Sequence, residues 1–499
     1  MEFLKRVKKV MTPDGNVGHQ AIKSGIWVSL INVSDRGFQL LKLVVLANLL
    51  SPEDFGLIGI ALLALGVLKQ FSQLGIDTAL IQKSEENVDK FLNTAWTMKI
   101  VRGLTLATIG YLVAPYIAQF FGEPRTTDLV RVIAISPILL GLRNPGVMYL
   151  QKNLEFHRQF IYKLSGTLVD VTVAIGFAIA TGSVWALVFG KISGDIIRAS
   201  VSYLIHSYRP RLGFKQPLGR ELLGYGKWLM GSGFTLFLIK QGDDAFVGWF
   251  LGASALGFYQ LAYRLSNAPA TEVSNVLQRV LLPTYSKIQD DTRKLREGYF
   301  KMVKLTTLVS IPMAMGIFVI TPVFVRAFLG SEWLPMVPAM QALAFFGLIR
   351  SVGAIDGPLL MAIGRPDIAT KLQFLHLTLL AALIYPVTAA AGILGTSVAS
   401  TISILVPVVM KAYVTIGLIE GSYRQYLRII LYPLTASGIM YSALLIIETI
   451  IDGMPPVSRF VLLVLSGVSM YAGFVLVMDY RFGYRVLPIF HEVRQAFGS

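Results

Sequence analysis

The sequence predicts an all-α protein that crosses a membrane about 14 times. Three observations lead to this prediction. Of the 499 residues, 54% are hydrophobic and only 15% are charged, with a mean hydropathy of +0.62. A soluble protein carries about 25% charged residues. Apolar runs long enough to form membrane-spanning helices recur along the chain, and Lys and Arg gather in every second connection between them.

The first two apolar runs, 25–50 and 55–82, form a predicted helical hairpin around the polar turn at 51–54. Polar residues recur on one face of each helix: Asp35, Gln39 and Lys42 in the first, and Lys69, Gln73 and Asp77 in the second. A charge at membrane depth costs about 2.5–3.5 kcal/mol, so it is tolerated where it faces protein or water. The two stripes therefore predict the wall of a water-filled cavity.

The remaining spans are predicted at 92–119, 128–150, 159–181, 183–206, 223–251, 254–282, 298–328, 336–363, 367–390, 393–418, 427–451 and 457–478. An even number of spans places both termini on one side of the membrane. Connections on that side hold nearly all the loop Lys and Arg, whereas the opposite connections hold Arg125 alone. Because positive loops mark the cytoplasmic side, we expect both termini to be cytoplasmic.

A constant shift along the chain brings Trp27 onto Trp228 and Gly56 onto Gly257, which predicts an internal repeat of six spans. Two such pseudosymmetric lobes would be parallel repeats about an axis along the membrane normal. The predicted regions are a basic amphipathic segment (1–20), an N-lobe (21–210), a C-lobe (211–420), two further helices (421–480) and an amphipathic cytoplasmic tail (481–499).

Charged residues in the middle of spans are the candidate site residues, and the basic ones predominate. A cationic cleft that attracts an anionic substrate is expected from Arg36, Lys42, Lys69, Lys240, Arg264 and Arg350. Candidates for binding a coupling ion are Asp35, Asp77, Asp243 and Asp244.

An internal ion pair is the alternative for the same side chains. In this alternative Asp35 pairs with Arg36 or Lys42. We favour Asp243, or both adjacent acids, as the balance for Lys240, because they lie three and four residues after it. Basic residues near span ends, such as Lys99 and Arg198, have the further alternative of reaching the membrane surface along their own stems.

Several classes of function are not expected. The chain has no cysteine, its five histidines lack metal-ligand spacing, and it contains no nucleotide-binding fingerprint. We therefore expect no metal, no cofactor, no catalytic residue and no enzymatic activity. The net charge of +16 is divided among short loops, so a nucleic-acid partner is not expected.

Four segments carry a family resemblance: LSPEDFG at 50–56, QLGI at 73–76, ALIQK at 79–83 and YLQKNLEF at 149–156. The chain resembles the polysaccharide transporter family, the Wzx-type lipopolysaccharide and oligosaccharide flippases of the multidrug/oligosaccharidyl-lipid/polysaccharide exporter superfamily. Within that family it looks closest to the colanic-acid exporter type.

The resemblance implies a flippase of the cytoplasmic (inner) membrane. It would move a polyprenyl-(pyro)phosphate-linked oligosaccharide from the inner to the outer leaflet for cell-surface polysaccharide biosynthesis, by alternating access through a cationic cleft. Implied partners are this substrate, membrane lipids, a coupling proton or sodium ion, and a polysaccharide polymerase. One alternative is a multidrug/cation antiporter of the same superfamily, which needs an acidic cavity. A membrane glycan polymerase, the other alternative, would need catalytic groups on sizeable outer loops.

Overall fold

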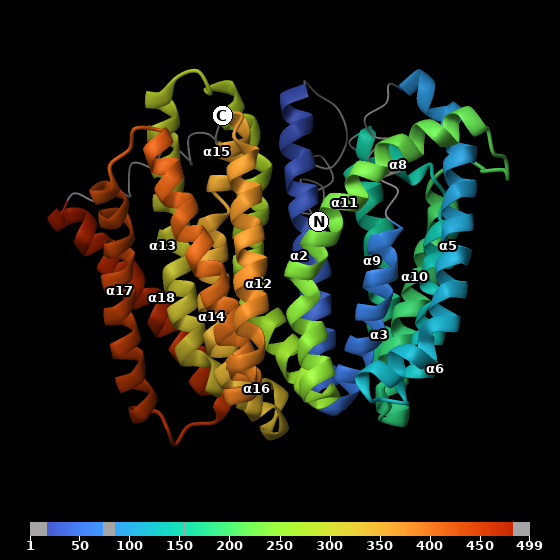
Figure 1. Ribbon diagram of the computed structural model, residues 1–499. Coiled ribbons are helices and arrows are strands. Elements are labelled where there is room, and N and C mark those ends of the chain that lie inside the picture. The colour runs from blue at the N-terminus through green and yellow to red at the C-terminus, as the bar shows by residue number, and fades with distance from the viewer. Residues whose placement is uncertain (1–16, 73–84, 154, 483–499) are drawn as a thin grey trace, which may run out of the picture. The chain divides into compact units, whose positions relative to one another are not determined.

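The structure is a computed structural model that describes residues 17–72, 85–153 and 155–482. Every element in these ranges is a helix, and none of the described residues forms a strand (Figure 1). The predicted all-α class is therefore confirmed. Most of the two predicted amphipathic terminal segments, and the stretch around Asp77, lie outside the described residues.

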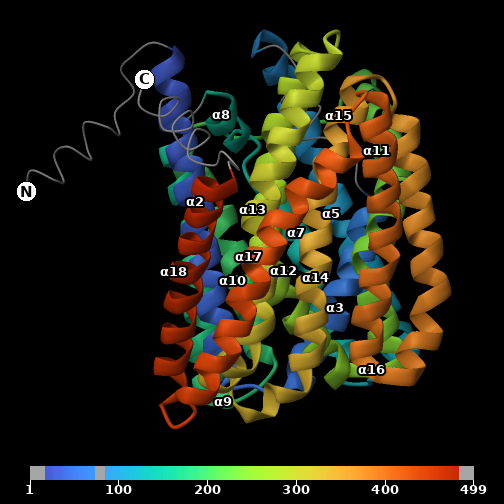
Figure 2. The ribbon, with the colours of Figure 1, turned by 90° about the vertical axis from the view of Figure 1, so that its left-hand side faces the viewer.

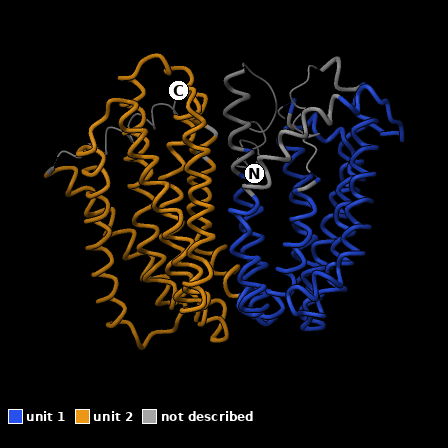
Figure 3. The backbone as a smooth tube through the Cα atoms, viewed as in Figure 1, with its two compact units in different colours: residues 1–257 blue, residues 258–499 orange. Residues whose placement is uncertain are grey.

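Contacts divide the chain into two compact units, residues 1–257 and 258–499 (Figure 3). Helices of the first unit are α2 (Val17–Ala47), α3 (Pro52–Phe71), α5 (Glu85–Phe121), α6 (Thr126–Ile133), α7 (Ser136–Leu142), α8 (Val147–Lys152), α9 (Phe156–Thr181), α10 (Trp185–Ile205), α11 (Gln216–Leu251) and the first residues of α12 (Ala253–Lys287).

The second unit continues with the rest of α12. It also contains α13 (Thr292–Phe324), the π-helix η1 (Val325–Leu329), the 3-10 helix η2 (Ser331–Met336), α14 (Val337–Gly353), α15 (Asp356–Ala362), α16 (Pro366–Leu418), α17 (Tyr423–Ile450) and α18 (Pro456–Phe482). The division into lobes at 210 and 420 stays a prediction.

Among the described residues, seven helical segments are long and apolar enough to cross a membrane. The chain is therefore a multi-pass membrane protein, while the exact number of spans stays a prediction. The 53-residue α16 comprises two helical segments, because Ala391 and Gly392 leave the helical conformation at the turn predicted between two spans. Thr388 and Thr396 then meet across that turn at 2.9 Å.

The predicted span 128–150 is broken into α6, α7 and α8, which corrects the expectation of one continuous helix. The second break has a local cause. Pro145 disfavours a helical conformation at Asn144, whose own side chain holds the turn open. Its Oδ1 accepts a hydrogen bond from Gly146 N at 2.9 Å, and its Nδ2 donates to Tyr208 O at 2.7 Å.

The turn between α2 and α3 is built from a capping box and a close backbone contact. Ser51 caps α3, with its hydroxyl accepting from Asp54 N and its backbone N–H donating to the Asp54 carboxylate. A Cβ at Gly56 would overlap the carbonyl oxygen of Ala253, and a Cβ at Gly257 would overlap that of Pro52. Gly56 with Gly257, and Pro52 with Ala253, are equivalent positions of the predicted repeat, so the contact is reciprocal and supports the repeat.

In the second unit, α17 and α18 pack together against α13 (Figure 2). Their shared core contains Val319 and Val323 of α13, Met440 and Leu444 of α17, and Leu463 of α18. These two last helices, placed outside the predicted repeat, are thus anchored on the second unit by apolar packing.

Candidate functional site: a basic pocket in the first unit

A cavity of about 360 Å³ opens among α3, α5, α7, α8 and α9 of the first unit. Its volume lies in the range of small-molecule sites, about 300–1,000 Å³. Four of its lining residues are basic, Lys69, Lys99, Arg102 and Arg143, and none is acidic. We call this cavity the basic pocket.

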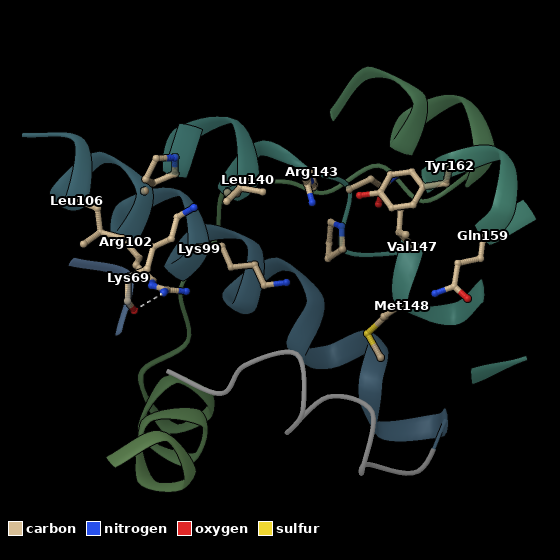
Figure 4. A pocket seen from close by; sticks show the side chains of 15 residues that line it. Lys69, Lys99, Arg102, Leu106, Leu140, Arg143, Val147, Met148, Gln159 and Tyr162 are labelled. Atoms are coloured by element: carbon tan, nitrogen blue, oxygen red, sulfur yellow. Dashed lines mark hydrogen bonds between the residues drawn. The ribbon is translucent and has the colours of Figure 1, made fainter. Parts of the chain in front are cut away.

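Figure 4 shows how the lining side chains are distributed. Lys69, Lys99 and Arg102 gather at one end of the pocket, and Tyr162 and Gln159 lie at the other. Arg143 extends between the two groups. The pocket therefore has a strongly basic end and a neutral polar end.

Glycines allow α5 and α7 to approach closely beside the pocket. A Cβ at Gly103 would lie 2.6 Å from Pro137 O, and a Cβ at Gly141 would lie 2.6 Å from Lys99 O. Such distances are too short for any side chain, so both positions require glycine to keep this spacing. The two contacts fix the backbone from which Lys99 enters the pocket.

Arg102 is fixed at the end of α3. Its Nη2 donates to Lys69 O at 3.2 Å and its Nε donates to Ser72 Oγ at 3.0 Å. The Lys69 carbonyl also accepts from Ser72 N at 3.3 Å, and the guanidinium adds a charged donor that complements the negative end of the helix dipole. The same contact holds Lys69 and Arg102 together at the pocket.

Arg143 is fixed from the other side by the buried carboxylate of Asp195, which is 1% exposed. Asp195 accepts hydrogen bonds from Ser136 at 2.7 Å, Arg143 at 3.0 Å, Lys191 at 3.2 Å and Arg198 at 3.3 Å. One carboxylate thus faces three cations, so the surroundings of the pocket keep an excess of positive charge. This ion-pair cluster combines residues of α7, α10 and the α7–α8 connection.

The predicted polar stripe of α2 faces protein, where we had expected the wall of a water-filled cavity. Thr167 of α9 donates to Asp35 at 2.5 Å, and Gln39 donates to Asp170 at 3.3 Å. Lys42 forms a buried ion pair with Asp170 at 2.5 Å. The ion-pair alternative therefore holds for Lys42, although its partner lies on α9 and is not Asp35.

Close packing of α9 and α10 makes room for these buried charges. A Cβ at Gly190 or Gly194 of α10 would crowd Asp170 of α9, and a Cβ at Gly166 would meet the side chain of Arg198. Arg198 in turn donates to Thr167 at 3.2 Å. These glycines thus leave room for Asp170 and Arg198 between α9 and α10.

The other candidates of the first unit do not line the basic pocket. Lys240 and Arg36 are exposed in the described structure, whereas Asp243 is 5% exposed. The pairing of Lys240 with Asp243, or with both adjacent acids, stays a prediction. The carboxylate of Asp243 accepts a hydrogen bond from Asp244 N at 3.0 Å.

Arg350 and Arg264 belong to the second unit. Arg350 connects α14 to α12, with its guanidinium donating to Tyr263 Oη at 3.1 Å, to Thr271 Oγ1 at 2.6 Å and to Asn267 O at 3.4 Å. These three bonds indicate a structural connection between the helices. Arg264 is exposed.

Of the six predicted substrate-binding residues, Lys69 is the one that lines the basic pocket. Lys99 was singled out from the sequence but was assigned a surface alternative, whereas Arg102 and Arg143 were not among the predicted binding residues. Asn144, Gln159 and Tyr162 were missed, because an uncharged polar residue in a span gives no comparable signal. Chemically, the arrangement can bind an anion through several charge-assisted hydrogen bonds, and the described residues contain no group of three metal-ligating side chains.

Comparisons with known proteins agree with this picture. The model of a family described as "Polysaccharide biosynthesis protein" matches residues 45–338. The lipopolysaccharide biosynthesis protein WzxC of Escherichia coli strain K12 is 26% identical over 415 residues, covering 82% of this chain and 83% of WzxC. The teichuronic acid biosynthesis protein TuaB of Bacillus subtilis strain 168 is 25% identical over 360 residues, covering 71% of this chain and 74% of TuaB.

One similarity concerns a solved structure. The lipid II flippase MurJ, in an inward closed conformation, matches with a TM-score of 0.73 and 17% sequence identity. The match covers 92% of this chain and 99% of that chain. The two proteins therefore share a fold.

Proposed function

The chain belongs to the polysaccharide biosynthesis protein family, and from this premise we propose that it is a flippase for a lipid-linked oligosaccharide. The substrate carries a polyprenyl (pyro)phosphate, and the protein moves it from the inner to the outer leaflet of the cytoplasmic membrane. The exported unit serves the synthesis of a cell-surface polysaccharide. The protein is a transporter and catalyses no covalent step.

The observation that carries the proposal is the basic pocket, with four basic and no acidic lining residues. A (pyro)phosphate is the part of such a substrate that cannot enter the apolar bilayer core unaided, because burying an uncompensated charge is expensive. Each charge-assisted bond from the pocket would contribute about 1.5–3 kcal/mol to holding it. A cation antiporter would need acids in this place, so the lining of the pocket disfavours that alternative.

In this mechanism Lys69, Lys99 and Arg102 bind the phosphate oxygens, and Arg143 contacts the same group from the other side. Gln159 and Tyr162, at the neutral end, are suited to hydroxyl groups of the first sugar. The lipid tail remains in the bilayer. Conformational exchange then opens the pocket to the opposite face.

The orientation follows from the loop charges. Both termini lie in the cytoplasm, and the basic pocket is near the cytoplasmic ends of its helices, since it contains the end of α3 and the start of α9. A polysaccharide polymerase receives the flipped substrate at the outer face. These assignments are part of the proposal.

The test is glycan export in cells that lack their own flippase and express this chain. Spheroplasts are treated with a glycosidase that cannot cross the membrane, and the fraction of cleaved lipid-linked oligosaccharide is measured over time. The wild-type chain should make the substrate accessible. Lys69→Gln should slow this about ten- to a hundredfold, the equivalent of one charge-assisted bond.

The matched control is Arg125→Gln, which removes an exposed arginine of the same unit that lies outside the pocket and binds Glu53. It should export at the wild-type rate. Lys69→Gln is a clean variant because the described structure shows no ion pair that it would break. Normal abundance of the wild-type chain with no accessible oligosaccharide would reject the proposed function.

A further inference from the structure

A buried carboxyl in the second unit lacks a basic partner at ion-pair distance in the described structure. Asp356, the first residue of α15, is 1% exposed, and its Oδ1 accepts a hydrogen bond from Tyr299 Oη at 2.8 Å. Around it lies an apolar cluster that includes Leu281, Ile355 and Leu359. A buried carboxylate without a cation in contact is costly, and the charge is removed when the group binds a proton.

A further oxygen atom at this place has no partner. The hydroxyl of Tyr285 is buried, at 1% residue exposure, and makes no hydrogen bond in the described structure. Tyr285, from α12, and Thr415, from α16, both adjoin Asp356. Buried polar groups without a partner are uncommon and need an explanation.

The charged and titratable surroundings favour a proton over a metal cation. Lys411 of α16 is the cation whose charge acts on Asp356, and His376 of the same helix lies near Lys411. Tyr426 of α17 is the remaining titratable neighbour, beside Tyr285 and Tyr299. The Lys411 charge opposes the binding of any cation at Asp356. A proton needs the carboxylate alone, whereas a metal ion needs several ligands, and the described residues contain no group of three metal-ligating side chains.

We propose that Asp356 is the proton-binding site through which the transport cycle is coupled to a proton gradient. In one conformation the carboxylate takes a proton from water and becomes a neutral carboxyl, whose O–H donates to the free hydroxyl oxygen of Tyr285. In the other conformation the same proton returns to water and the carboxylate accepts from Tyr299. The inference rests on the proposed function, since coupling requires transport.

This site differs from the ion-coupling candidates of the sequence. The carboxylate of Asp35 is bound by Thr167, and Asp243 accepts from the backbone of Asp244. Asp77 lies outside the described residues. Asp356 combines full burial, a neutral donor in Tyr299 and an adjacent free hydroxyl in Tyr285, and therefore carries the inference further than these acids.

The experiment uses right-side-out membrane vesicles in which potassium and valinomycin clamp the membrane potential. The initial rate of oligosaccharide cleavage by the impermeant glycosidase is measured with and without an imposed gradient of about 1 pH unit. For one coupled proton, this gradient should change the wild-type rate up to about tenfold. Asp356→Asn, which keeps the size of the side chain, should retain a basal rate that ignores the gradient, and Asp356→Glu should respond to it.

Asp291→Asn is the matched control, because it removes a carboxylate of the same unit that is exposed at the start of α13. It should respond like the wild type. If Asp356→Asn does not accumulate in the membrane, Tyr285→Phe replaces it, since this change removes a hydroxyl that bonds nothing in the described structure. Tyr285→Phe should export, with a shifted pH midpoint of the rate.

Each outcome of these experiments supports or overturns the assignment of Asp356 as the coupling site. A wild-type response in Asp356→Asn overturns the inference, as does a wild-type rate that follows an imposed sodium gradient and ignores pH. An unchanged pH midpoint in Tyr285→Phe also overturns it when Asp356→Asn is not obtained. If the wild-type chain exports nothing even without an imposed gradient, the proposed function is rejected, and this outcome is distinct from a failure of the coupling inference.

Discussion

The buried ion pair between Lys42 and Asp170 can be probed by removing its partners singly and together. The two side chains are 11% and 10% exposed, and the carboxylate has one further described donor, Gln39 at 3.3 Å. Lys42→Met leaves a buried carboxylate with that neutral donor, and Asp170→Leu leaves a buried ammonium. Breaking a buried pair in this way costs about 3–5 kcal/mol.

The double variant Lys42→Met/Asp170→Leu removes both charges and leaves apolar side chains of similar length. Replacing a whole buried pair is often neutral or stabilising. We therefore expect the double variant to be more stable than either single variant by about 3–5 kcal/mol. Additive losses would show that the pair contributes no coupling.

Stability is measured as the fraction of detergent-solubilised protein that remains monodisperse after heating for a fixed time. A fixed time is needed because membrane proteins of this size unfold irreversibly. The exposed pair Arg125–Glu53, at 58% and 45% side-chain exposure, provides the matched control, and its removal should cost about 0–1 kcal/mol.

Export by the same variants separates the two roles assigned to Lys42. If Lys42→Met is as stable as the wild type but no longer exports, the lysine contacts the substrate and the reasoning from the ion pair is refuted. If stability and export fall together in the single variant and both recover in the double variant, the lysine serves structure.

Three further outcomes follow from local contacts. Gly56→Val should prevent accumulation of folded protein, because a side chain there overlaps the carbonyl oxygen of Ala253. Gly176→Val is the control, since open space surrounds this position, and it should accumulate normally. Accumulation is measured by immunoblotting of the membrane fraction. The hydrogen bond from Lys294 N lowers the pKa of the Asp291 carboxyl, so its stabilising effect is present at neutral pH and disappears as the pH falls through the lowered pKa. The difference in heat resistance between wild type and Asp291→Ala should therefore shrink with acidification, and a constant difference would contradict this. Arg350→Lys should leave less monodisperse protein than the wild type after heating, because an ammonium cannot reproduce the guanidinium bonds to α12, which together contribute about 1–3 kcal/mol. An unchanged fraction would contradict this.

Hydropathy was sufficient to predict most helices and some turns. The turn predicted at 391–392 is confirmed, because Ala391 and Gly392 leave the helical conformation there. Gly392 adopts a positive φ, which ends the helix inside an apolar run that contains no charge. The division of the span 128–150 into three helices was not predicted, since most of its residues are apolar. The decisive signal was local, namely Pro145 after an Asn that can hydrogen-bond the turn.

The candidate site was only partly accessible to sequence reasoning. Periodicity placed Asp35 and Lys42 on one face of a helix but could not tell whether that face meets water or another helix. The answer depends on Thr167 and Asp170, more than 120 residues away along the chain. Similarly, Lys99 and Arg143 join in one pocket because Gly103 and Gly141 bring their helices together, and the sequence records no such contact.

The reciprocal meeting of the two helical turns has an evolutionary consequence. Pro52 faces Gly257 as Ala253 faces Gly56, so each copy offers the same surface to the other. An interface of this kind is self-complementary, which is the geometry of a dimer with two-fold symmetry. An ancestor of half the length could therefore have associated with a second copy of itself through this turn. Fusion of the two genes would then have freed each half to diverge.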